Sequence, residues 1–362
     1  MMTAAIGIDI GGSSLRAAIV EHDGRIVRAK SRRLGERSPE ALLNQLEDLL
    51  QSLGGAGDAA MAVGLAAVIR LQTGVVTVAP NLGWHQVPFA EMLARRFGRP
   101  VRLVNDLDAI TVGEAACGAG KGATDVVCVF VGTGVGMGAV VDGRVLEGCG
   151  GTATELGHIK VESTIDGRLC GCGERGCLET YASGRHLPEL VRAKVERGRQ
   201  TRLVADVEGH GDWKALTAER IEAAAKDGDE VAREVWRDAA GYLGRAIGNL
   251  VTIFNPRVLV LGGGVLEAAP SLRRAVVAGI NADAARPQLA DVSIRDSELG
   301  DQAGLVGAGL LAHQAALARV GDEGRVAPRP PGAGVTGGGV GSAAAAAARE
   351  SDEDESGPTT PR

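Results

Sequence analysis

One pattern occurs twice along the chain: an apolar strand, a glycine-rich turn, a second strand and a tight hairpin. The first copy passes through Asp9-Ile-Gly-Gly-Ser13 to the turn at Asp23-Gly24, and the second through Gly132-Thr-Gly-Val-Gly136 to Asp142-Gly143. Short strands joined by such turns form antiparallel meanders. Two related halves that face each other would place both glycine turns at one cleft, so the repeat constrains the fold to two similar units.

Outside the two copies, apolar residues recur with either a strand or a helix period. Short apolar runs predict strands over 61–68, 101–104 and 258–261. Helical spacing predicts helices from Ser38-Pro39 onward, over 89–97, over 217–254 with a break at Asp227-Gly228, and over 301–318 with Asp301 near its cap. Strands and helices together make an α/β body that ends near residue 320.

The last 42 residues, 321–362, have a composition unlike that of the body. They include nine glycines, five prolines, a run of six alanines and the acidic run 352–355, but no aromatic residue. Such a segment cannot bury enough apolar surface to offset the entropy of ordering, so we expect a disordered tail.

Composition excludes several classes of function. The chain has 39 basic and 45 acidic residues and a net charge of −6, whereas proteins that bind duplex nucleic acid usually carry a basic face. It has no run of about 18 apolar residues that could cross a membrane, and its start lacks the regions of a signal peptide. We expect a cytoplasmic protein with neither nucleic acid nor membrane as partner.

Glycine-rich turns follow three of the predicted strands, at Gly11-Gly12-Ser13, Gly132-Thr133-Gly134 and Gly262-Gly263-Gly264. Such a turn presents unpaired backbone N–H groups and lets a phosphate approach without a Cβ clash. One turn alone is more typical of a structural hairpin, but three together favour a phosphate and nucleotide site. Asp9, beside the first turn, is a suitable partner for hydrated Mg²⁺. None of the turns has the Walker A or Rossmann spacing.

Asn105 and Asp106 stand where a predicted strand ends, with Asp108 close behind. Asn and Asp are also typical helix N-caps, so the local pattern leaves both interpretations open. Open α/β sheets bind ligands at the carboxyl ends of their strands, and a carboxylate there can remove the proton from a substrate hydroxyl. Asp106 is therefore a candidate general base.

The strongest local signal is His158-x₁₁-Cys170-x-Cys172-x₄-Cys177. Three thiolates and one imidazole complete a tetrahedral Zn²⁺ site with no open position, so we expect a structural zinc. The alternative is free buried cysteines. That is what we expect of the remaining three, which stand singly in apolar segments: Cys117, Cys128 and Cys149.

Glu155 and Glu179 flank the predicted zinc cluster. The metal would hold these carboxylates and the His158 ring in fixed places. Each hydroxyl group of a polyol needs both a donor and an acceptor, and such a set supplies both. The arrangement favours a sugar-like substrate.

With these motifs the chain resembles the ROK family of sugar kinases and repressors, and within it the bacterial, actinobacterial-type glucokinases. The resemblance covers about residues 4–318 in the family's order. It rests on Gly7-Ile-Asp9-Ile-Gly-Gly12, Val104-Asn105-Asp106, Gly132-Thr-Gly-Val-Gly-Met-Gly138, Glu155-Leu-Gly-His158, Cys170-Gly-Cys-Gly-Glu-Arg-Gly-Cys177-Leu-Glu179, Leu261-Gly-Gly-Gly-Val265 and Gly304-Leu-Val-Gly-Ala308. The cysteine signature with the preceding Glu-x-Gly-His is highly specific, whereas the glycine turns are not.

The resemblance implies an α/β fold of the actin-like, hexokinase-like ATPase type, with two ribonuclease H-like lobes around a cleft and a structural zinc site. It implies a small N-terminal lobe of 1–117 plus 301–320, which contributes the closing helix. The large lobe would be 118–300, with the zinc site and the nucleotide-binding turn. Residues 321–362 would be the tail.

The resemblance also implies a role for each candidate site residue. Asp106 is expected to be the catalytic base of an ATP-dependent hexose kinase. Sugar hydroxyls are expected to contact Asn81, Asn105, Asp106, Glu155, His158 and Glu179. ATP and Mg²⁺ are expected at Asp9, Gly11, Gly12, Ser13, Gly132, Thr133, Gly134, Gly262, Gly263 and Gly264. Zn²⁺ is expected at His158, Cys170, Cys172 and Cys177, with the other ring nitrogen of the histidine facing the sugar.

The expected reaction is phosphorylation of glucose to glucose 6-phosphate. The segment Ala79-Pro-Asn81-Leu-Gly-Trp84 resembles the glucokinase form of a loop in the sugar lobe, which favours glucose over N-acetylated hexoses. Ser13 conservatively replaces a common Thr of the family, and three further departures bear on the sugar pocket. Ala67 and Arg70 stand where glucokinases commonly have Gly and Asp, and Asp108 replaces an Asn. They leave the details of the sugar pocket open.

Two alternatives remain: a kinase for fructose, mannose or an N-acetylhexosamine, and a sugar-responsive regulator of the same family. Regulators carry a helix-turn-helix domain before the first phosphate turn, which here begins by Asp9, so we expect an enzyme. The zinc signature favours ATP over polyphosphate as donor. We expect a homo-oligomer, either a dimer or a tetramer.

Overall fold

The computed structural model describes residues 4–54, 57–210 and 212–322. The described residues up to Val320 form one compact unit. The tail predicted over 321–362 lies outside the described residues, apart from its first two positions. None of the described helices is both long and apolar enough to cross a membrane.

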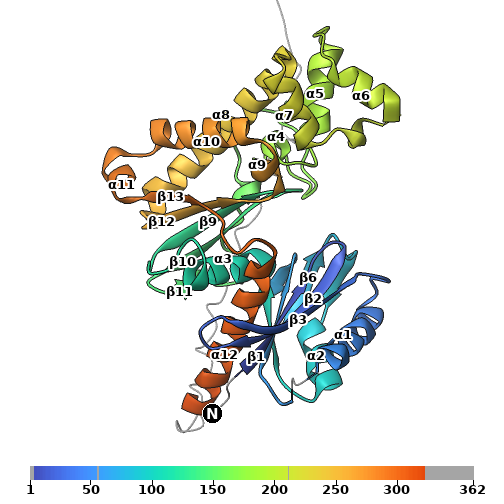
Figure 1. Ribbon diagram of the computed structural model, residues 1–362, viewed down its shortest axis with the longest axis vertical. Helices are drawn as coiled ribbons and strands as arrows, with labels where there is room; N and C mark the ends of the chain where they lie inside the picture. Colours follow the sequence, from blue (N-terminus) through green and yellow to red (C-terminus); the bar gives the residue numbers. More distant parts are fainter. Residues whose placement is uncertain (1–3, 55–56, 211, 323–362) are drawn as a thin grey trace, which may run out of the picture. The chain divides into compact units, whose positions relative to one another are not determined.

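The N-terminal part of the chain forms a five-stranded sheet with the order β3-β2-β1-β4-β8 (Figure 1). Its strands are β1 (Ala4–Ile10), β2 (Ser14–Glu21), β3 (Ile26–Arg33), β4 (Met61–Leu65) and β8 (Val101–Asn105). The first three form the predicted antiparallel meander, and β4 and β8 continue the sheet in parallel with β1.

Helices α1 (Pro39–Leu53) and α2 (Phe89–Phe97) pack on this first sheet. Ser38 caps α1 as predicted, since its Oγ accepts a hydrogen bond from the Ala41 N–H at 3.4 Å. The helical spacing of leucines in α1 places Leu42, Leu46 and Leu53 in the core, where each is fully buried.

The second sheet repeats this topology with the order β11-β10-β9-β12-β13. Its strands are β9 (Val126–Val131), β10 (Val135–Val141), β11 (Arg144–Val145), β12 (Val258–Gly262) and β13 (Ser293–Asp296). Again a meander of three antiparallel strands is extended by two parallel ones. The predicted internal repeat is therefore confirmed at the level of strand order and direction.

Two long helices, α8 (Glu230–Phe254) and α10 (Pro270–Asp283), contribute to the core beneath the second sheet. Figure 1 shows them side by side, and their backbones approach closely at Gly244 and Gly279. The predicted break in the long helical region is confirmed, because α7 (Ala218–Lys226) ends before it and Asp229 caps α8.

Helices α3 (Asp106–Cys117) and α12 (Ala303–Asp322) join the two sheets. A Cβ at Gly138 of β10 would collide with the side chain of Thr111 in α3, and one at Gly7 of β1 would collide with the Leu305 carbonyl in α12. A Cβ at Gly307 of α12 would collide with a carbonyl of α3. Close packing of helices and strands thus explains these three glycines, which lie outside the predicted phosphate-binding turns.

The remaining elements complete the chain. The prediction of one strand over 61–68 is wrong, because the chain bends after β4 and enters a separate sheet of β5 (Val68–Arg70), β6 (Val75–Ala79) and β7 (Trp84–Val87).

The last helix begins at Ala303, after the 3₁₀ turn η3 (Gly300–Gln302), and not at Asp301. The other helical elements are η1 (Leu156–His158), α4 (Glu179–Ala182), α5 (Leu187–Glu196), α6 (Leu203–His210), η2 (Trp213–Ala215), α9 (Gly264–Ala268) and α11 (Arg286–Asp291).

Candidate functional site

Asp106 is the first residue of α3, at the point where β8 ends. Asn105 caps the helix, because its Oδ1 accepts a hydrogen bond from the Leu107 N–H at 2.8 Å. Oδ1 of Asp106 accepts from the same N–H at 3.0 Å. No hydrogen bond to its Oδ2 occurs within the described residues. The helix cap and the general base can therefore be different residues: Asn105 caps α3, and Asp106 stays available as the candidate base.

The surroundings of Asp106 make its carboxylate more basic. Burial is the largest cause that raises its pKa, and with the carboxylates of Asp9 and Glu155 it brings the pKa to about 6 against the opposing Leu107 N–H. A pKa near the working pH suits a general base, which must be ionised and still accept a proton. The structure thus brings Asp9 from β1 and Glu155 from the loop before η1 to the same carboxylate.

Asp9 lies near the end of β1, opposite Arg16 of β2. An Arg16 Nη1 is 3.9 Å from Oδ2 of Asp9 and 3.3 Å from Oδ1 of Asp301. Burial raises the pKa of Asp9, while the guanidinium lowers it. The sequence interpretation missed Arg16, although the register of the predicted hairpin places it opposite Asp9. Asp301, expected near a helix cap, instead pairs with this arginine from η3.

The first glycine turn is held by an arginine that the sequence did not single out. Arg37 donates hydrogen bonds to the carbonyl of Gly12 at 3.0 Å and to the carbonyl of Asn81 at 2.7 Å. Asn81 therefore lies beside the Gly11–Ser13 turn, and among the described residues no contact joins it to Asp106 or Glu155. An isolated arginine in a loop carries no sequence signal for this role.

The second and third glycine turns lie together, as the parallel pairing of β9 and β12 requires. The carbonyl of Gly132 accepts a hydrogen bond from the Gly184 N–H at 2.8 Å, so the turn is fastened to a later loop. Gly263 has φ 96°, and a Cβ there would lie 2.6 Å from the Val131 carbonyl oxygen. Only glycine fits this approach. Backbone N–H groups of both turns are thus gathered at one edge of the second sheet.

The four predicted zinc ligands converge. The ligand atoms of His158, Cys170, Cys172 and Cys177 all lie within 4.8 Å of one another. The Sγ atoms of Cys172 and Cys177 are 3.7 Å apart, and Sγ of Cys170 is 3.7 Å from Nδ1 of His158. Tetrahedral zinc with Zn–S bonds of about 2.3 Å separates two sulfurs by about 3.8 Å. The residues therefore fit Zn²⁺, with Nδ1 of the histidine toward Cys170.

The backbone around the cluster is folded tightly enough to require glycine. Two short antiparallel bridges, Lys160 with Cys177 and Leu169 with Arg175, fold the cysteine loop back on itself. Gly176 has φ 77°, and a Cβ there would collide with a backbone carbonyl. Nζ of Lys160 lies 3.2 Å from Sγ of Cys177, so its positive charge offsets part of the thiolate charge.

Glu179 connects the zinc cluster with the second glycine turn. Its Oε1 accepts a hydrogen bond from Sγ of Cys170 at 3.2 Å, and its Oε2 lies 3.0 Å from where a Cβ of Gly134 would stand. Desolvation raises the pKa of Glu155. The neighbouring His158 lowers this pKa, and the Glu179 carboxylate raises it. Carboxylates and an imidazole therefore face one region, as a polyol substrate requires.

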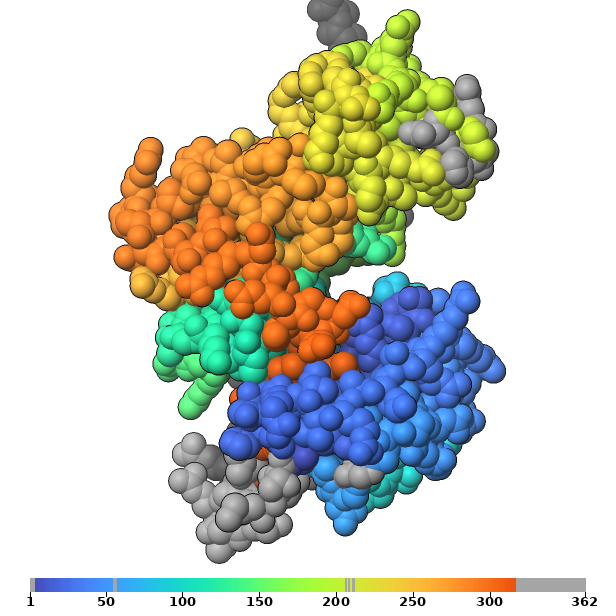
Figure 2. All heavy atoms as spheres, viewed as in Figure 1, coloured from blue at the N-terminus to red at the C-terminus, as the bar shows by residue number. Residues whose placement is uncertain are grey.

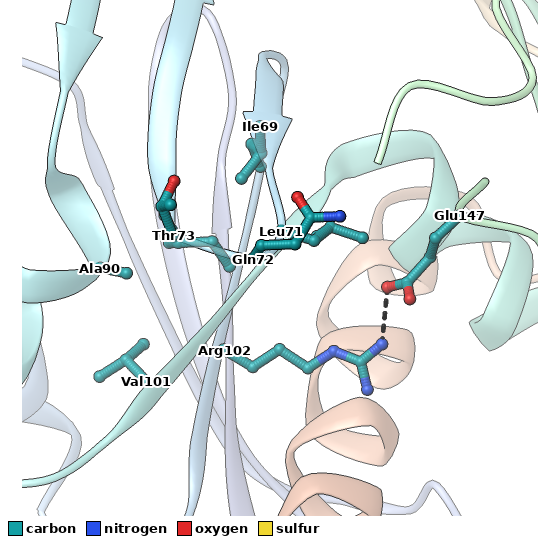
Figure 3. Close-up of a pocket in the computed structure, with 10 residues that line it drawn as sticks. Ile69, Leu71, Gln72, Thr73, Ala90, Val101, Arg102 and Glu147 are labelled. Carbon is teal, nitrogen blue, oxygen red and sulfur yellow. Dashed lines mark hydrogen bonds and ion pairs between the residues drawn. The ribbon is translucent and has the colours of Figure 1, made fainter. Parts of the chain in front are cut away.

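Figure 3 shows a cavity of about 340 Å³ that contains none of the predicted site residues. Arg102 and Glu147, 2.7 Å apart, form an ion pair at its wall. Burial first, and then the carboxylates of Glu147 and Asp106, raise the pKa of the neighbouring Asp108 to about 7. Asp108 is 7% exposed, and its Oδ1 has no hydrogen-bond partner among the described residues.

The three cysteines outside the cluster differ from one another. Cys128 is buried, as expected, and Cys117 is half-buried. Cys149 is exposed, so the expectation that it lies in the core is wrong. It lies in the loop after β11, where its carbonyl accepts a hydrogen bond from the Gln72 side chain. A surface loop whose nearest residues are glycines offers no apolar side chains to bury it.

Comparison with known proteins places this site in context. The model of the ROK family matches residues 5–315. The chain is 33% identical over 318 residues to a glucokinase from Streptomyces coelicolor, covering 86% of this chain and 98% of the relative. It is 30% identical over 313 residues to a xylose repressor from Caldicellulosiruptor bescii, covering 83% of this chain and 76% of the repressor. The structure is also similar to the crystal structure of a ROK family glucokinase from Streptomyces griseus in complex with glucose and AMPPNP. The TM-score is 0.71 at 31% identity, and the match covers 86% of this chain and 99% of that one.

Proposed function

The chain belongs to the ROK family, and on that premise we propose that it is a glucokinase, which transfers the γ-phosphoryl group of ATP to glucose. Its fold is the α/β fold of ROK sugar kinases. The observation that carries the proposal is the glucokinase likeness over nearly the whole chain, with the basic carboxylate of Asp106 at the centre of the site.

In the proposed reaction, Asp106 removes the proton from the glucose 6-hydroxyl. The oxygen attacks the γ-phosphorus, the bond to the β-phosphate oxygen breaks and ADP leaves. Burial and the neighbouring carboxylates support this role, because they raise the pKa of Asp106 to about 6. Most of the catalysis then comes from positioning and from charge stabilisation.

The other site residues have proposed roles in binding. Backbone N–H groups of the Gly11–Ser13 and Gly132–Gly134 turns would hold ATP phosphates, and the Gly262–Gly264 turn would hold the nucleotide. Asp9 would hold Mg²⁺, which neutralises phosphate charge when bound with ATP. Glucose hydroxyls would contact Asn81, Asn105, Glu155, Nε2 of His158 and Glu179.

The zinc has a proposed structural role. The fit of the four ligands supports it, because no ligand position remains for a substrate. The metal would fix two sugar-binding side chains: His158, which is itself a ligand, and Glu179, which follows the ligand Cys177 by two residues. The chemistry of transfer takes place elsewhere, at Asp106.

We further propose the two lobes implied by the family, 1–117 plus 301–320 and 118–300, in the actin-like arrangement. The repeated strand order of the two sheets supports this division. Because the donor is ATP, we place the reaction in the cytoplasm, at the entry of glucose into glycolysis. The homo-oligomeric state stays a prediction.

A kinase for another hexose is the second candidate, and the Ala67 departure is the observation that favours it. The Ala67 carbonyl accepts a hydrogen bond from Nδ2 of Asn105 at 3.3 Å. This position therefore contacts a residue that is proposed to bind the sugar. A change at this position can alter how Asn105 meets the sugar. Arg70, another of the departures, is exposed on β5.

A coupled assay with Mg²⁺ and a panel of hexoses tests the proposal, with ATP or inorganic polyphosphate as donor. We expect the highest kcat/KM for glucose with ATP, by at least tenfold over fructose, mannose and N-acetylglucosamine. A higher value for another hexose would support the second candidate. Sugar binding by calorimetry without any turnover would contradict both and indicate a regulator.

A further inference from the structure

We propose that the ion pair between Arg102 and Glu147 positions the sugar-binding residues that lie on its two sides. This inference rests on the proposed function and adds two positioning residues to it. Nη2 of Arg102 is 2.7 Å from Oε1 of Glu147. Arg102 belongs to β8 of the first sheet, and Glu147 lies in the loop after β11 of the second. The ion pair therefore connects the two halves of the body.

On the side of Arg102, the ion pair acts on the strand that ends at the candidate base. Arg102 is the second residue of β8, Asn105 is the last, and Asp106 follows as the first residue of α3. β8 pairs in parallel with β4, which holds the strand in the first sheet. Regular backbone links these residues, so the guanidinium has a fixed position relative to Asn105 and Asp106.

On the side of Glu147, the ion pair acts on the loop that leads to Glu155. The Glu147 carbonyl accepts a hydrogen bond from the Ala153 N–H at 3.3 Å, so the loop closes two residues before Glu155. Within it Thr154 has φ 66°, a conformation that is unfavourable for a β-branched residue. Such a conformation persists only where surrounding contacts hold it. The position of Glu155 therefore depends on how firmly the base of this loop is anchored.

Two other contacts hold the middle of the loop. The Gln72 side chain donates a hydrogen bond to the Cys149 carbonyl, and a Cβ at Gly151 would lie 2.6 Å from the carbonyl oxygen of Ile69. The ion pair instead acts at the base of the loop, where its two ends meet. The middle and the base thus have separate anchors, and loss of one leaves the other in place.

Side chains do not fill the space beside the ion pair. The pair lies at the wall of the cavity of about 340 Å³ that Figure 3 shows. Packing is closer at α12, whose orange start lies against the blue N-terminal strands in Figure 2, since a Cβ at Gly7 would collide there with the Leu305 carbonyl. Beside the cavity, the ion pair is the contact that sets the distance between β8 and the loop.

Partial burial makes this ion pair stronger than an ordinary surface pair. The side chains of Arg102 and Glu147 are 25% and 26% exposed, and a direct hydrogen bond accompanies the charge contact. Fully exposed pairs contribute little because water screens them, whereas partly buried, hydrogen-bonded pairs are screened less. The pair can therefore hold Glu155 in place opposite Asn105 and Asp106 before a sugar binds.

A double-mutant cycle of Arg102→Gln, Glu147→Gln and the double variant tests the proposal. Each single variant should raise the Kd for glucose at least fivefold, by calorimetry, and change the KM for ATP less than twofold. The double variant should lose no more than either single variant, because all three lack the same contact. Losses that multiply in the double variant, or an equal rise in the KM for ATP, would overturn the proposal.

A second ion pair supplies the matched control. Arg96 of α2 and Glu47 of α1 are 2.9 Å apart, on helices that pack on the first sheet outside the candidate site. Arg96→Gln and Glu47→Gln remove the same charges and should leave the Kd for glucose within twofold. Losses as large as those at Arg102 and Glu147 would show a general effect of removing ion pairs and would overturn the specific role.

Hydrogen exchange without sugar separates this inference from the proposed function. Glu147→Gln should speed amide exchange over residues 148–154 at least tenfold, because the loop loses the anchor at its base. Unchanged exchange there would overturn the positioning role. If the unmodified protein neither bound nor phosphorylated glucose, the proposed function would fail, and the exchange rates would still support or refute the role of the ion pair.

Discussion

Asp106 shows how one side chain acquires its chemistry from neighbours far away in the chain. The carboxylate lies at the first position of α3, and burial together with Asp9 and Glu155 raises its pKa to about 6. One neighbour comes from the first strand and the other from the loop before η1. At neutral pH the group is mostly ionised and still a stronger base than an exposed aspartate.

Asp106→Asn should lower kcat about 10²- to 10⁴-fold, because the amide cannot accept the proton. The amide oxygen can keep the hydrogen bond from the Leu107 N–H, so the Kd for glucose should stay within about threefold. Steady-state kinetics and calorimetry measure the two effects. Asp108→Asn, the same change two residues later, is the control. A near-wild-type kcat in the first variant would refute the assignment of the base.

Asp108 should make the protein less stable as the pH rises. Its folded-state pKa of about 7 exceeds the unfolded value of about 3.9, so the folded state binds more protons between these values. Stability is therefore lost through this window. Asp108→Asn should remove that loss, so it should raise Tm by a few degrees at pH 8 and by clearly less at pH 5, which lies in the lower part of the window. The pKa difference sets an upper limit of about 4 kcal/mol. Equal effects at both pH values would contradict this origin.

At the scale of elements, the loop from η1 to α4 joins the proposed zinc ligands to the proposed sugar-binding residues. His158 ends η1 and Glu179 begins α4, so the cluster lies between these two elements. Neither element has enough length to be stable alone. The position of both elements therefore depends on the loop between them, which carries the three cysteines of the cluster.

Cys172→Ser should remove bound zinc and raise the Kd for glucose about 10- to 100-fold, since loss of the metal frees His158 and Glu179. A colorimetric zinc assay and glucose titration measure both in one preparation. Cys149→Ser makes the same change at an exposed thiol outside the cluster and should alter neither. A zinc-free variant that binds glucose normally would refute the coupling.

The glycines at the joint of α3 and α12 should be intolerant of any side chain. Gly307→Ala should lower the free energy of unfolding by about 3 kcal/mol or more, because its Cβ would collide with the Ala109 carbonyl. Gly241→Ala lies in α8, where a Cβ meets nothing within 4 Å, and should raise stability by about 0.5–1 kcal/mol. Urea titration of both variants measures the contrast, and similar values for the two would contradict the packing argument.

At the scale of the whole molecule, the repeated sheets were predictable and much of the packing was not. The strand–turn–strand patterns at Asp9 and Gly132 predicted both meanders, because short strands and glycine turns are local. The cysteine spacing predicted the cluster for the same reason. The sheet of β5, β6 and β7, the Arg37 contacts and the Arg16–Asp301 pair depend on residues far apart in sequence, which no local pattern records.

A chain that ends at Asp322 should keep the Tm within about 1 °C and kcat/KM within twofold of the full chain. The removed segment, 323–362, has almost no large apolar side chain, so it adds little buried surface. A chain that ends at Leu310 is the control, because it also lacks Leu311 and Ala312, which are fully buried, and it should lose several degrees. A large drop in Tm for the first truncation would contradict the prediction of a passive tail.

The backbone contact between α3 and α12 has a mechanical consequence. Backbone lies against backbone at this joint, and a packed core joins the two sheets around it, so a displacement of α12 is passed on to α3. Asp106 is the first residue of α3 and therefore moves with this helix. The position of the candidate base is thus tied to a helix from the other end of the chain.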